Sequence, residues 1–207
     1  MKSLELLNDL LKINSIKISI NKSFSWASGW KSPIYFDNRI SLSYPKIRKE
    51  ITLRLVDFIK KKYEKVEVIA GVATAGIPQG VLVADILNLP FIYVRSQNKS
   101  HGMKNLIEGK LEKNSRTILI EDLISTGGSS IKSVEAIRES GSEVLSVLSI
   151  FNYGFKISKN NFQNISCDTN SIFNYSDLME VAHQEKYITK SELEKLKNWR
   201  EDPEKWK

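Results

Sequence analysis

Apolar residues recur at helical spacing in some parts of the chain and form short strand-like runs in others. Leucines at helical spacing near the N-terminus predict a first short helix, and an apolar stripe after Pro45 predicts a longer second one. Further along, apolar runs predict strands at residues 66–71, 91–94, 117–120 and 144–151, with helices at 77–87 and 129–139. Strands that alternate with helices are typical of a mostly parallel sheet flanked by helices, so we expect an α/β fold.

The pattern changes after Tyr153. Residues 156–170 are rich in Asn and Ser, and we expect an irregular segment there with room for a short strand. Two further helices are expected at 175–184 and 189–199, the second opening with a capping-box spacing. We therefore expect one domain over residues 1–207, with a core at about 45–153 and a small cap from about 1–44 and 154–207.

The hydrophobic and charged fractions of the chain are typical of folded soluble proteins. Of its 207 residues, 41% are hydrophobic and 27% are charged. No apolar run approaches the ~20 residues needed to span a bilayer, and the N-terminus lacks the apolar core of a signal peptide. The single Cys167 cannot form an intrachain disulfide. We expect a cytoplasmic protein without a membrane partner, in which Cys167 is a small buried hydrophobe.

The formal net charge is +7, but its distribution does not favour nucleic-acid binding. The lysines are spread along the chain, often beside glutamates, which is typical of solvated helix faces. A basic balance also suits an enzyme whose substrates are polyanions, because positive potential raises the rate at which phosphates and carboxylates are captured. We therefore expect small anionic ligands and no nucleic acid.

The segment from Ile118 to Ser130 carries the most informative motif. An apolar strand is followed by Glu121 and Asp122, by a turn of Ser, Thr and Gly, and by the start of a helix. Ligands of parallel sheets bind beyond the carboxyl ends of the strands. Backbone N–H groups in such a turn can surround an anion, and the helix N-terminus adds a partial positive charge. Residues 125–129 are thus a candidate phosphate cradle, and the adjacent carboxylates can accept hydrogen bonds from vicinal ribose hydroxyls.

This segment resembles the phosphoribosyl pyrophosphate signature of type I phosphoribosyltransferases. No Gly-Lys-Ser/Thr follows it, so a Walker A ATPase is excluded. Three other segments are similar to those of the orotate phosphoribosyltransferase family. They are the loop from Arg95 to Gly109, the segment from Ser28 to Arg39, and the glycine-containing segment from Gly71 to Pro78. The resemblance extends from the N-terminal helix to about Tyr153 and is nearest to the branch typical of Gram-positive bacteria.

The resemblance implies the type I phosphoribosyltransferase fold and transfer of a phosphoribosyl group to orotate. It implies magnesium held mostly by substrate oxygens and water, with Asp122 a candidate direct ligand. It also implies a homodimer that shares loop 96–110 across its interface. The implied catalytic residues are Arg95, Lys99, His101 and Asp122, where His101 and Lys99 are rival acids toward the leaving group. The implied residues that bind phosphoribosyl pyrophosphate are Thr74, Ala75, Gly76, Arg95, Lys99, His101, Glu121, Asp122, Leu123, Ile124, Ser125, Thr126, Gly127, Gly128 and Ser129.

Orotate is a flat aromatic acid and needs an apolar face, polar partners and a cation. Tyr35 and Phe36 are candidates for the face, and Lys31 or Arg39 for the charge. The family resemblance adds Ser125. The better-known enterobacterial pattern differs at four positions, because Ser96, Ala27 and Ala75 replace lysines and Tyr153 replaces a base-binding arginine. These differences leave the partner of the orotate carboxylate open, with Arg39 as a candidate.

Two alternatives remain at the level of sequence. The signature would also suit a phosphoribosyltransferase for another base, such as a purine. A non-catalytic relative that binds phosphoribosyl pyrophosphate or RNA and regulates transcription is consistent with the positive charge. The Ser28–Pro33 segment and the Lys99–Gly102 segment favour orotate over another base. The intact loop residues argue against a regulator, because a pure sensor has little need of them.

Overall fold

The four apolar runs that were predicted to be strands all lie in the central sheet. The computed structural model describes residues 3–26, 29–96 and 106–206. The sheet order is β10-β9-β8-β5-β6-β7. Neighbouring strands among β9, β8, β5 and β6 are parallel, and β7 is antiparallel to β6, which confirms the predicted mostly parallel α/β fold. The strands are β5 (Val68–Val72), β6 (Phe91–Val94), β7 (Ile107–Glu108), β8 (Arg116–Ile124), β9 (Glu143–Asn152) and β10 (Thr169–Asn174).

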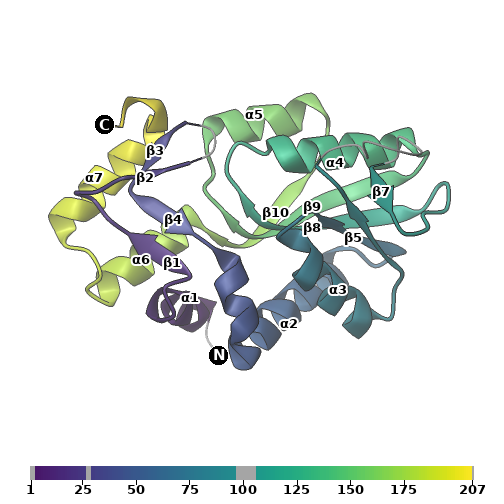
Figure 1. The fold of residues 1–207 in the computed structure, drawn as a ribbon, viewed down its shortest axis with the longest axis horizontal. Coiled ribbons are helices and arrows are strands. Elements are labelled where there is room, and N and C mark those ends of the chain that lie inside the picture. Colours follow the sequence, from purple (N-terminus) through teal and green to yellow (C-terminus); the bar gives the residue numbers. More distant parts are fainter. Residues whose placement is uncertain (1–2, 27–28, 97–105, 207) are drawn as a thin grey trace. The chain divides into compact units, whose positions relative to one another are not determined.

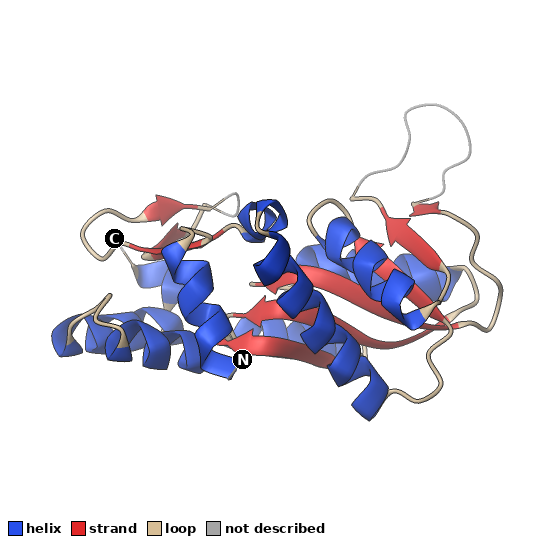
Figure 2. Cartoon of the chain, turned by 90° about the horizontal axis from the view of Figure 1, so that it is seen from below, coloured by secondary structure: helices blue, strands red, loops and turns tan. Residues whose placement is uncertain are grey.

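Helices cover both faces of this sheet. Figure 1 shows α4 (Gly128–Glu139) and α5 (Lys156–Asn164) on one side, and α2 (Pro45–Lys62) and α3 (Gly76–Leu87) on the other. In Figure 2 the red strands likewise lie between layers of blue helices. Residues such as Ala70 and Leu119 pack in one core cluster with Val134 of α4 and Phe162 of α5. Because both faces are covered, residues 68–72 of β5 and 118–120 of β8 are wholly apolar.

The chain divides into two compact units, Lys49–Ile172 and Met1–Arg48 with Phe173–Lys207. In the second unit the two ends of the chain are joined by the indole N–H groups of two tryptophans. Trp199 donates to the carbonyl of Lys31 at 3.2 Å and Trp206 donates to the hydroxyl of Ser23 at 2.9 Å. The proposed single domain, with its core and cap, stays a prediction. Elements of this unit are α1 (Ser3–Lys12), β1 (Ile16–Ile18), β2 (Phe24–Ser25), β3 (Lys31–Ser32), β4 (Ile34–Phe36), η1 (Asn38–Ser43), α6 (Tyr175–Gln184), α7 (Lys190–Glu201) and η2 (Pro203–Lys205).

Two expectations about local structure were wrong. Residues 156–164 form helix α5 instead of an irregular segment, because Ser158 and Phe162 bury one face of a helix whose Asn and Ser residues have low intrinsic propensity. The expected loop 96–110 contains strand β7, which gains its backbone hydrogen bonds from the edge of β6. The capping box at Thr189 and Glu192 is confirmed. Strand β8 continues to Ile124, so Glu121 and Asp122 lie within it.

Cys167 has 8% of its surface exposed and packs in the same core cluster as Leu119, which confirms its expected role as a buried hydrophobe. Within the residues that the structure describes, no helix has the length and hydropathy to cross a membrane.

Helix α3 begins in direct contact with strand β8. A side-chain Cβ added at Gly76 would overlap the carbonyl oxygen of Ile120 and would lie 3.4 Å from the Cα of Glu121. Only glycine therefore fits between the first turn of α3 and the backbone of β8. This contact sets the segment after β5 directly beside the acidic pair.

Replacing Gly76 with alanine is expected to lower the free energy of unfolding by about 1–3 kcal/mol, because the backbone of β8 would have to move. Gly128→Ala is the matched control, since no atom lies within 4 Å of a Cβ at that position. Urea denaturation should show a change of less than about 0.5 kcal/mol for the control. Equal stabilities of the two variants would contradict the assigned contact.

Candidate active site

Three candidate segments follow neighbouring parallel strands. Residues 73–76 follow β5, Arg95 follows β6, and residues 125–129 follow β8. Since β8, β5 and β6 are adjacent and parallel, their carboxyl ends lie at the same edge of the sheet. The fold therefore brings the predicted phosphate cradle, the glycine-containing segment and the loop arginine to one edge.

The predicted phosphate cradle is a tight turn that leads into α4. Gly127 has φ +84° and caps the helix, a left-handed conformation that suits glycine. Gly128 and Ser129 are exposed in the first turn of α4, where backbone N–H groups lack partners within the helix. The hydroxyl of Ser133 donates to the carbonyl of Ser129 at 3.1 Å. The turn thus has the backbone conformation and the helix dipole of an anion site.

Glu121 is the buried member of the acidic pair, with 6% of its surface exposed. One carboxylate oxygen accepts a hydrogen bond from the hydroxyl of Ser130 at 3.0 Å, and the other accepts from the N–H of Asp122 at 3.2 Å. Burial, and then the charge of Asp122, raise the pKa of Glu121 well above its usual range, while the Ser130 hydrogen bond lowers it. The neutral form is favoured, which reduces repulsion of an anion in the adjacent turn.

Asp122 is half-buried at the same strand end. Its Oδ1 accepts a hydrogen bond from the N–H of Leu123 at 2.8 Å. Leu123 is half-buried and Ile124 is buried, so this end of β8 still packs on the core. Asp122 is the more accessible of the two acids for a ligand.

The segment after β5 approaches β8 closely. Thr74 is exposed, Ala75 precedes α3 as its N-cap, and Gly76 lies against the backbone of Ile120. The peptide bond between Ala73 and Thr74 is cis. The N–H of Ala73 donates to the carbonyl of Val94 at 2.9 Å, which ties this segment to β6. A second helix N-terminus therefore lies beside the acidic pair.

Arg95 is held at the end of β6. Its N–H donates to the carbonyl of Leu106 at 2.9 Å, and its guanidinium lies 3.5 Å from the carboxylate of Glu108 on β7. The two ends of the intervening loop are thus joined by a backbone hydrogen bond. Lys99 and His101, the other predicted loop residues, lie outside the described part of the chain.

The candidates for orotate binding other than Ser125 belong to the smaller unit. Lys31 is exposed and donates to the hydroxyl of Ser25 at 2.8 Å. Tyr35 packs against Phe24, with ring centroids 5.5 Å apart, whereas Phe36 is buried on the opposite face of β4. Arg39 makes a two-pronged ion pair with Asp37 at 2.7 and 2.8 Å, which holds the pKa of Asp37 below its usual range. Their role in orotate binding stays a prediction.

Tyr153, which replaces an arginine of the related pattern, is a core residue. It is 1% exposed, stacks on Phe155 at 5.4 Å and meets Phe151 edge-on at 5.0 Å. Its N–H donates to the carbonyl of Ile124 at 3.0 Å, which fastens the segment after β9 to the end of β8.

The acidic pair has the donor chemistry that magnesium prefers. Carboxylate oxygens are hard ligands, and Asp122 offers one at the open end of β8. Among the described residues, no three His, Cys, Asp or Glu side chains gather as a metal site. The residues present fit an ion that receives most of its ligands from substrate and water.

The structure also identifies supporting residues that the sequence did not indicate. Asn161 of α5 donates to the carbonyl of Thr126 at 3.1 Å, Ser130 contacts Glu121, and Glu108 pairs with Arg95. Each is a common polar residue outside the local motif or at its margin, so no sequence pattern marks it.

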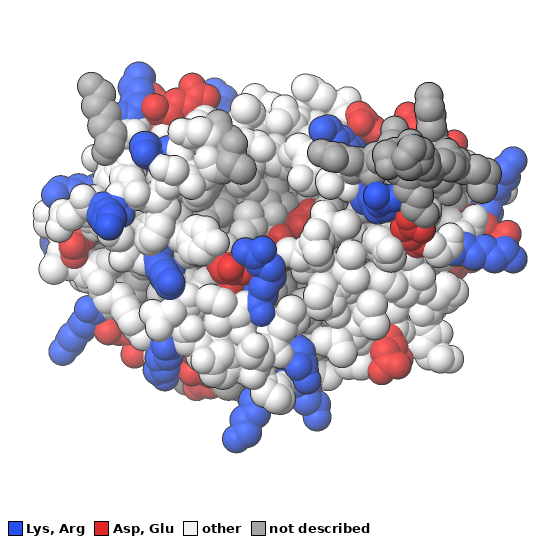
Figure 3. All heavy atoms as spheres, in the orientation of Figure 1, with Lys and Arg blue, Asp and Glu red and all other residues white. Residues whose placement is uncertain are grey.

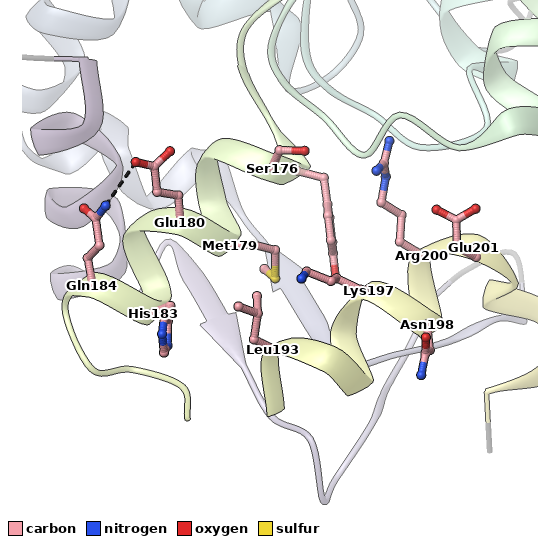
Figure 4. Close-up of a pocket in the computed structure, with 11 residues that line it drawn as sticks. Ser176, Met179, Glu180, His183, Gln184, Leu193, Lys197, Asn198, Arg200 and Glu201 are labelled. Atoms are coloured by element: carbon pink, nitrogen blue, oxygen red, sulfur yellow. Dashed lines mark hydrogen bonds between the residues drawn. The ribbon is translucent and has the colours of Figure 1, made fainter. Parts of the chain in front are cut away.

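A cavity of about 490 Å³ lies elsewhere, between α6 and α7 (Figure 4). Met179 and Leu193 face each other within it, and Glu180 and Lys197 lie among the polar side chains around them. None of the predicted site residues lines this cavity, and it is not a candidate for the motif chemistry.

The fold and the motif at its carboxyl edge define the class of type I phosphoribosyltransferases. A family model described as the phosphoribosyl transferase domain matches residues 44–184. The chain is 50% identical to an orotate phosphoribosyltransferase of Cytophaga hutchinsonii, over 96% of this chain and 95% of that protein. It is 48% identical to one of Bacteroides thetaiotaomicron, over 100% and 98% of the two chains. The chain therefore belongs to the orotate phosphoribosyltransferase family.

The fold is also similar to a solved structure. The crystal structure of orotate phosphoribosyltransferase from Aeropyrum pernix matches with a TM-score of 0.77 and 24% identity, over 89% of this chain and 99% of that one. At this identity the likeness shows the fold alone.

The pKa of Glu121 predicts how stability depends on pH. The folded state keeps the Glu121 proton to a higher pH than the unfolded state, whose glutamates ionise at about pH 4.3. Stability should therefore fall as pH rises above that value, by at most about 1.4 kcal/mol per pH unit. Glu121→Gln should remove this fall, since an amide can donate to Ser130 and accept from the N–H of Asp122. Free energies of unfolding measured by urea denaturation between about pH 4 and about pH 9 test this.

Glu143→Gln is the matched control, because Glu143 is exposed and lies on the neighbouring strand β9. The control should keep the pH dependence of the parent protein. An unchanged dependence in Glu121→Gln would show that Glu121 is not the titrating group.

Proposed function

We propose that this chain transfers the 5-phosphoribosyl group from phosphoribosyl pyrophosphate to orotate, giving orotidine 5′-monophosphate and pyrophosphate in the biosynthesis of UMP. The observation that carries the proposal is the near-full-length similarity to orotate phosphoribosyltransferases. The shared carboxyl edge of β8, β5 and β6 supports it, because anion-binding turns and carboxylates meet there. Enzymes of the phosphoribosyltransferase family generally use phosphoribosyl pyrophosphate with magnesium.

The turn at residues 125–129 would anchor the 5′-phosphate, including Ser125, Thr126, Gly127, Gly128 and Ser129. A phosphate bound there is remote from the breaking bond, so its binding energy can position the reacting carbon. Asp122, together with Glu121, would accept hydrogen bonds from the ribose hydroxyls. The backbone at Leu123 and Ile124 would complete this side of the ligand.

The pyrophosphate would lie toward residues 74–76 and the loop that follows β6. Negative charge grows on the pyrophosphate as the bond to the ribose carbon breaks, and Arg95, Lys99 and His101 would stabilise that charge. His101 would protonate the leaving group, with Lys99 as its rival. Arg95 and Glu108 are both half-buried, and the distance between their charged groups is long at 3.5 Å, so we expect Arg95 to exchange this partner for the pyrophosphate.

Magnesium would be held by substrate oxygens and water, with Asp122 as a candidate ligand, and would supply charge neutralisation to the pyrophosphate. Lys31, Tyr35, Phe36, Arg39 and Ser125 would bind orotate. No strong general base is needed, since orotate as a dianion is already nucleophilic. We further propose a cytoplasmic homodimer in which loop 96–110 is shared between subunits.

Binding of nucleic acid is not supported as the main activity. On the face shown in Figure 3, positive and negative side chains are interspersed. This pattern suits a protein with small anionic ligands better than one that tracks a nucleic-acid backbone.

Asp122→Asn is expected to lower kcat/KM about tenfold to hundredfold, because a charged acceptor of hydrogen bonds becomes neutral. The Leu123 N–H keeps its partner in this isosteric variant. The assay is the loss of orotate absorbance with phosphoribosyl pyrophosphate and magnesium. Asp168→Asn is the matched control, since Asp168 is exposed and belongs to the same compact unit as Asp122. An unaffected Asp122→Asn would remove Asp122 from the proposed site.

Lys99→Ala is expected to reduce kcat by about 10²–10³-fold, as for the loss of one group that stabilises transition-state charge. Lys113→Ala is its control, because Lys113 is exposed and lies outside loop 96–110. Turnover with a purine but not with orotate would support the proposed phosphoribosyl site and contradict orotate as the substrate. Absence of turnover with every base, together with salt-sensitive RNA binding, would favour a regulator.

A further inference from the structure

Two consecutive residues of helix α5 contact the proposed phosphate turn. The side-chain amide of Asn161 donates to the carbonyl of Thr126 at 3.1 Å. The ring of Phe162 lies against Gly127, where an added Cβ would be 2.5 Å from the nearest ring carbon. Two successive residues of α5 thus contact two successive residues of the turn.

The hydrogen bond from Asn161 fixes the direction of a peptide group. In a trans peptide, the C=O and the following N–H point in opposite directions. With the carbonyl of Thr126 directed at Asn161, the N–H of Gly127 is directed away from α5. The side chain of Asn161 therefore determines which way one donor of the turn points.

Helix α5 is itself anchored to the core of the larger unit. Ser158 and Phe162 are buried one turn apart, and Phe162 packs in the cluster that contains Leu119. Asn161 is half-buried beside them, whereas the neighbouring Asn160 is exposed. A rigid helix therefore presents the Asn161 amide to the turn.

We propose that Asn161 is a positioning residue for the phosphate turn, which orients the N–H of Gly127 toward the 5′-phosphate of the bound ligand. The inference rests on the proposed function in that residues 125–129 are taken to bind this phosphate. Asn161 acts through Thr126 and need not touch the substrate.

The test compares Asn161→Ala with Asn160→Ala, a change of the same residue type one position away on the same helix. Alanine has a higher helix propensity than asparagine, so neither change should melt α5. Calorimetry with ribose 5-phosphate measures the phosphate site without catalysis. Asn161→Ala should weaken ribose 5-phosphate binding and raise the KM for phosphoribosyl pyrophosphate about fivefold to tenfold, the usual effect of one lost hydrogen bond. The KM for orotate should change less than about twofold, because a lost hydrogen bond at the turn is remote from the base.

A residue with only a structural role would lower the melting temperature and leave the affinity for ribose 5-phosphate equal to that of Asn160→Ala. That result would overturn the proposal, as would equal rises in the KM of both substrates. Failure of the parent protein to bind ribose 5-phosphate would overturn it as well. If the parent protein binds ribose 5-phosphate but does not turn over orotate, the proposed base fails while the comparison of the two variants still decides the role of Asn161.

Discussion

The close approach of α3 to β8 is the constraint on which the candidate site depends. Gly76 lies against the carbonyl of Ile120, so the turn after β5 and the acids of β8 are neighbours without an intervening side chain. Parallel pairing of β5 with β8 aligns Gly71 with Ile120, which brings both strand ends to the same level. A larger residue at this position would separate the N-termini of α3 and α4, which the proposed substrate would contact together. The close packing of α3 against β8 therefore also determines the geometry of the candidate site.

The burial of Glu121 also reduces the repulsion expected between the acidic pair and a bound phosphate. Two adjacent charged carboxylates beside the proposed phosphate turn would repel a phosphate bound there. Burial of Glu121 and its hydrogen bond from Ser130 place one carboxyl away from solvent, and its raised pKa favours the neutral form. Asp122 remains the accessible acid. The accessible Asp122 would thus accept hydrogen bonds from a sugar, while the buried Glu121 would add less negative charge beside the phosphate.

Local patterns allowed the strand, turn and helix of residues 116–139 to be predicted, because apolar burial, small turn residues and helix start follow one another in sequence. The short helices and strands that depend on distant partners could not be predicted in this way. Helix α5 has a poor intrinsic propensity and is stabilised by Phe162 in the core, and β7 exists through pairing with β6. The residues of the candidate site differ in the same way, since some belong to a local motif and others come from a distant part of the chain. Glu121 and Asp122 are recognisable from the motif, whereas Asn161 lies 35 residues along the chain from Thr126, its partner in the turn.

This division has a physical reason. Groups that contact a ligand are restricted to a few chemical types, since a phosphate requires N–H donors and a sugar requires acceptors. A positioning group only has to supply one hydrogen bond or one surface at the right place, and many residue types can do so from any element. One such bond changes binding by about a factor of ten at most, so its residue type leaves little trace in a short pattern. The carbonyl of Thr126 accepts a hydrogen bond from Asn161 of α5, so in the proposed arrangement the orientation of a backbone donor depends on a residue that no local motif contains.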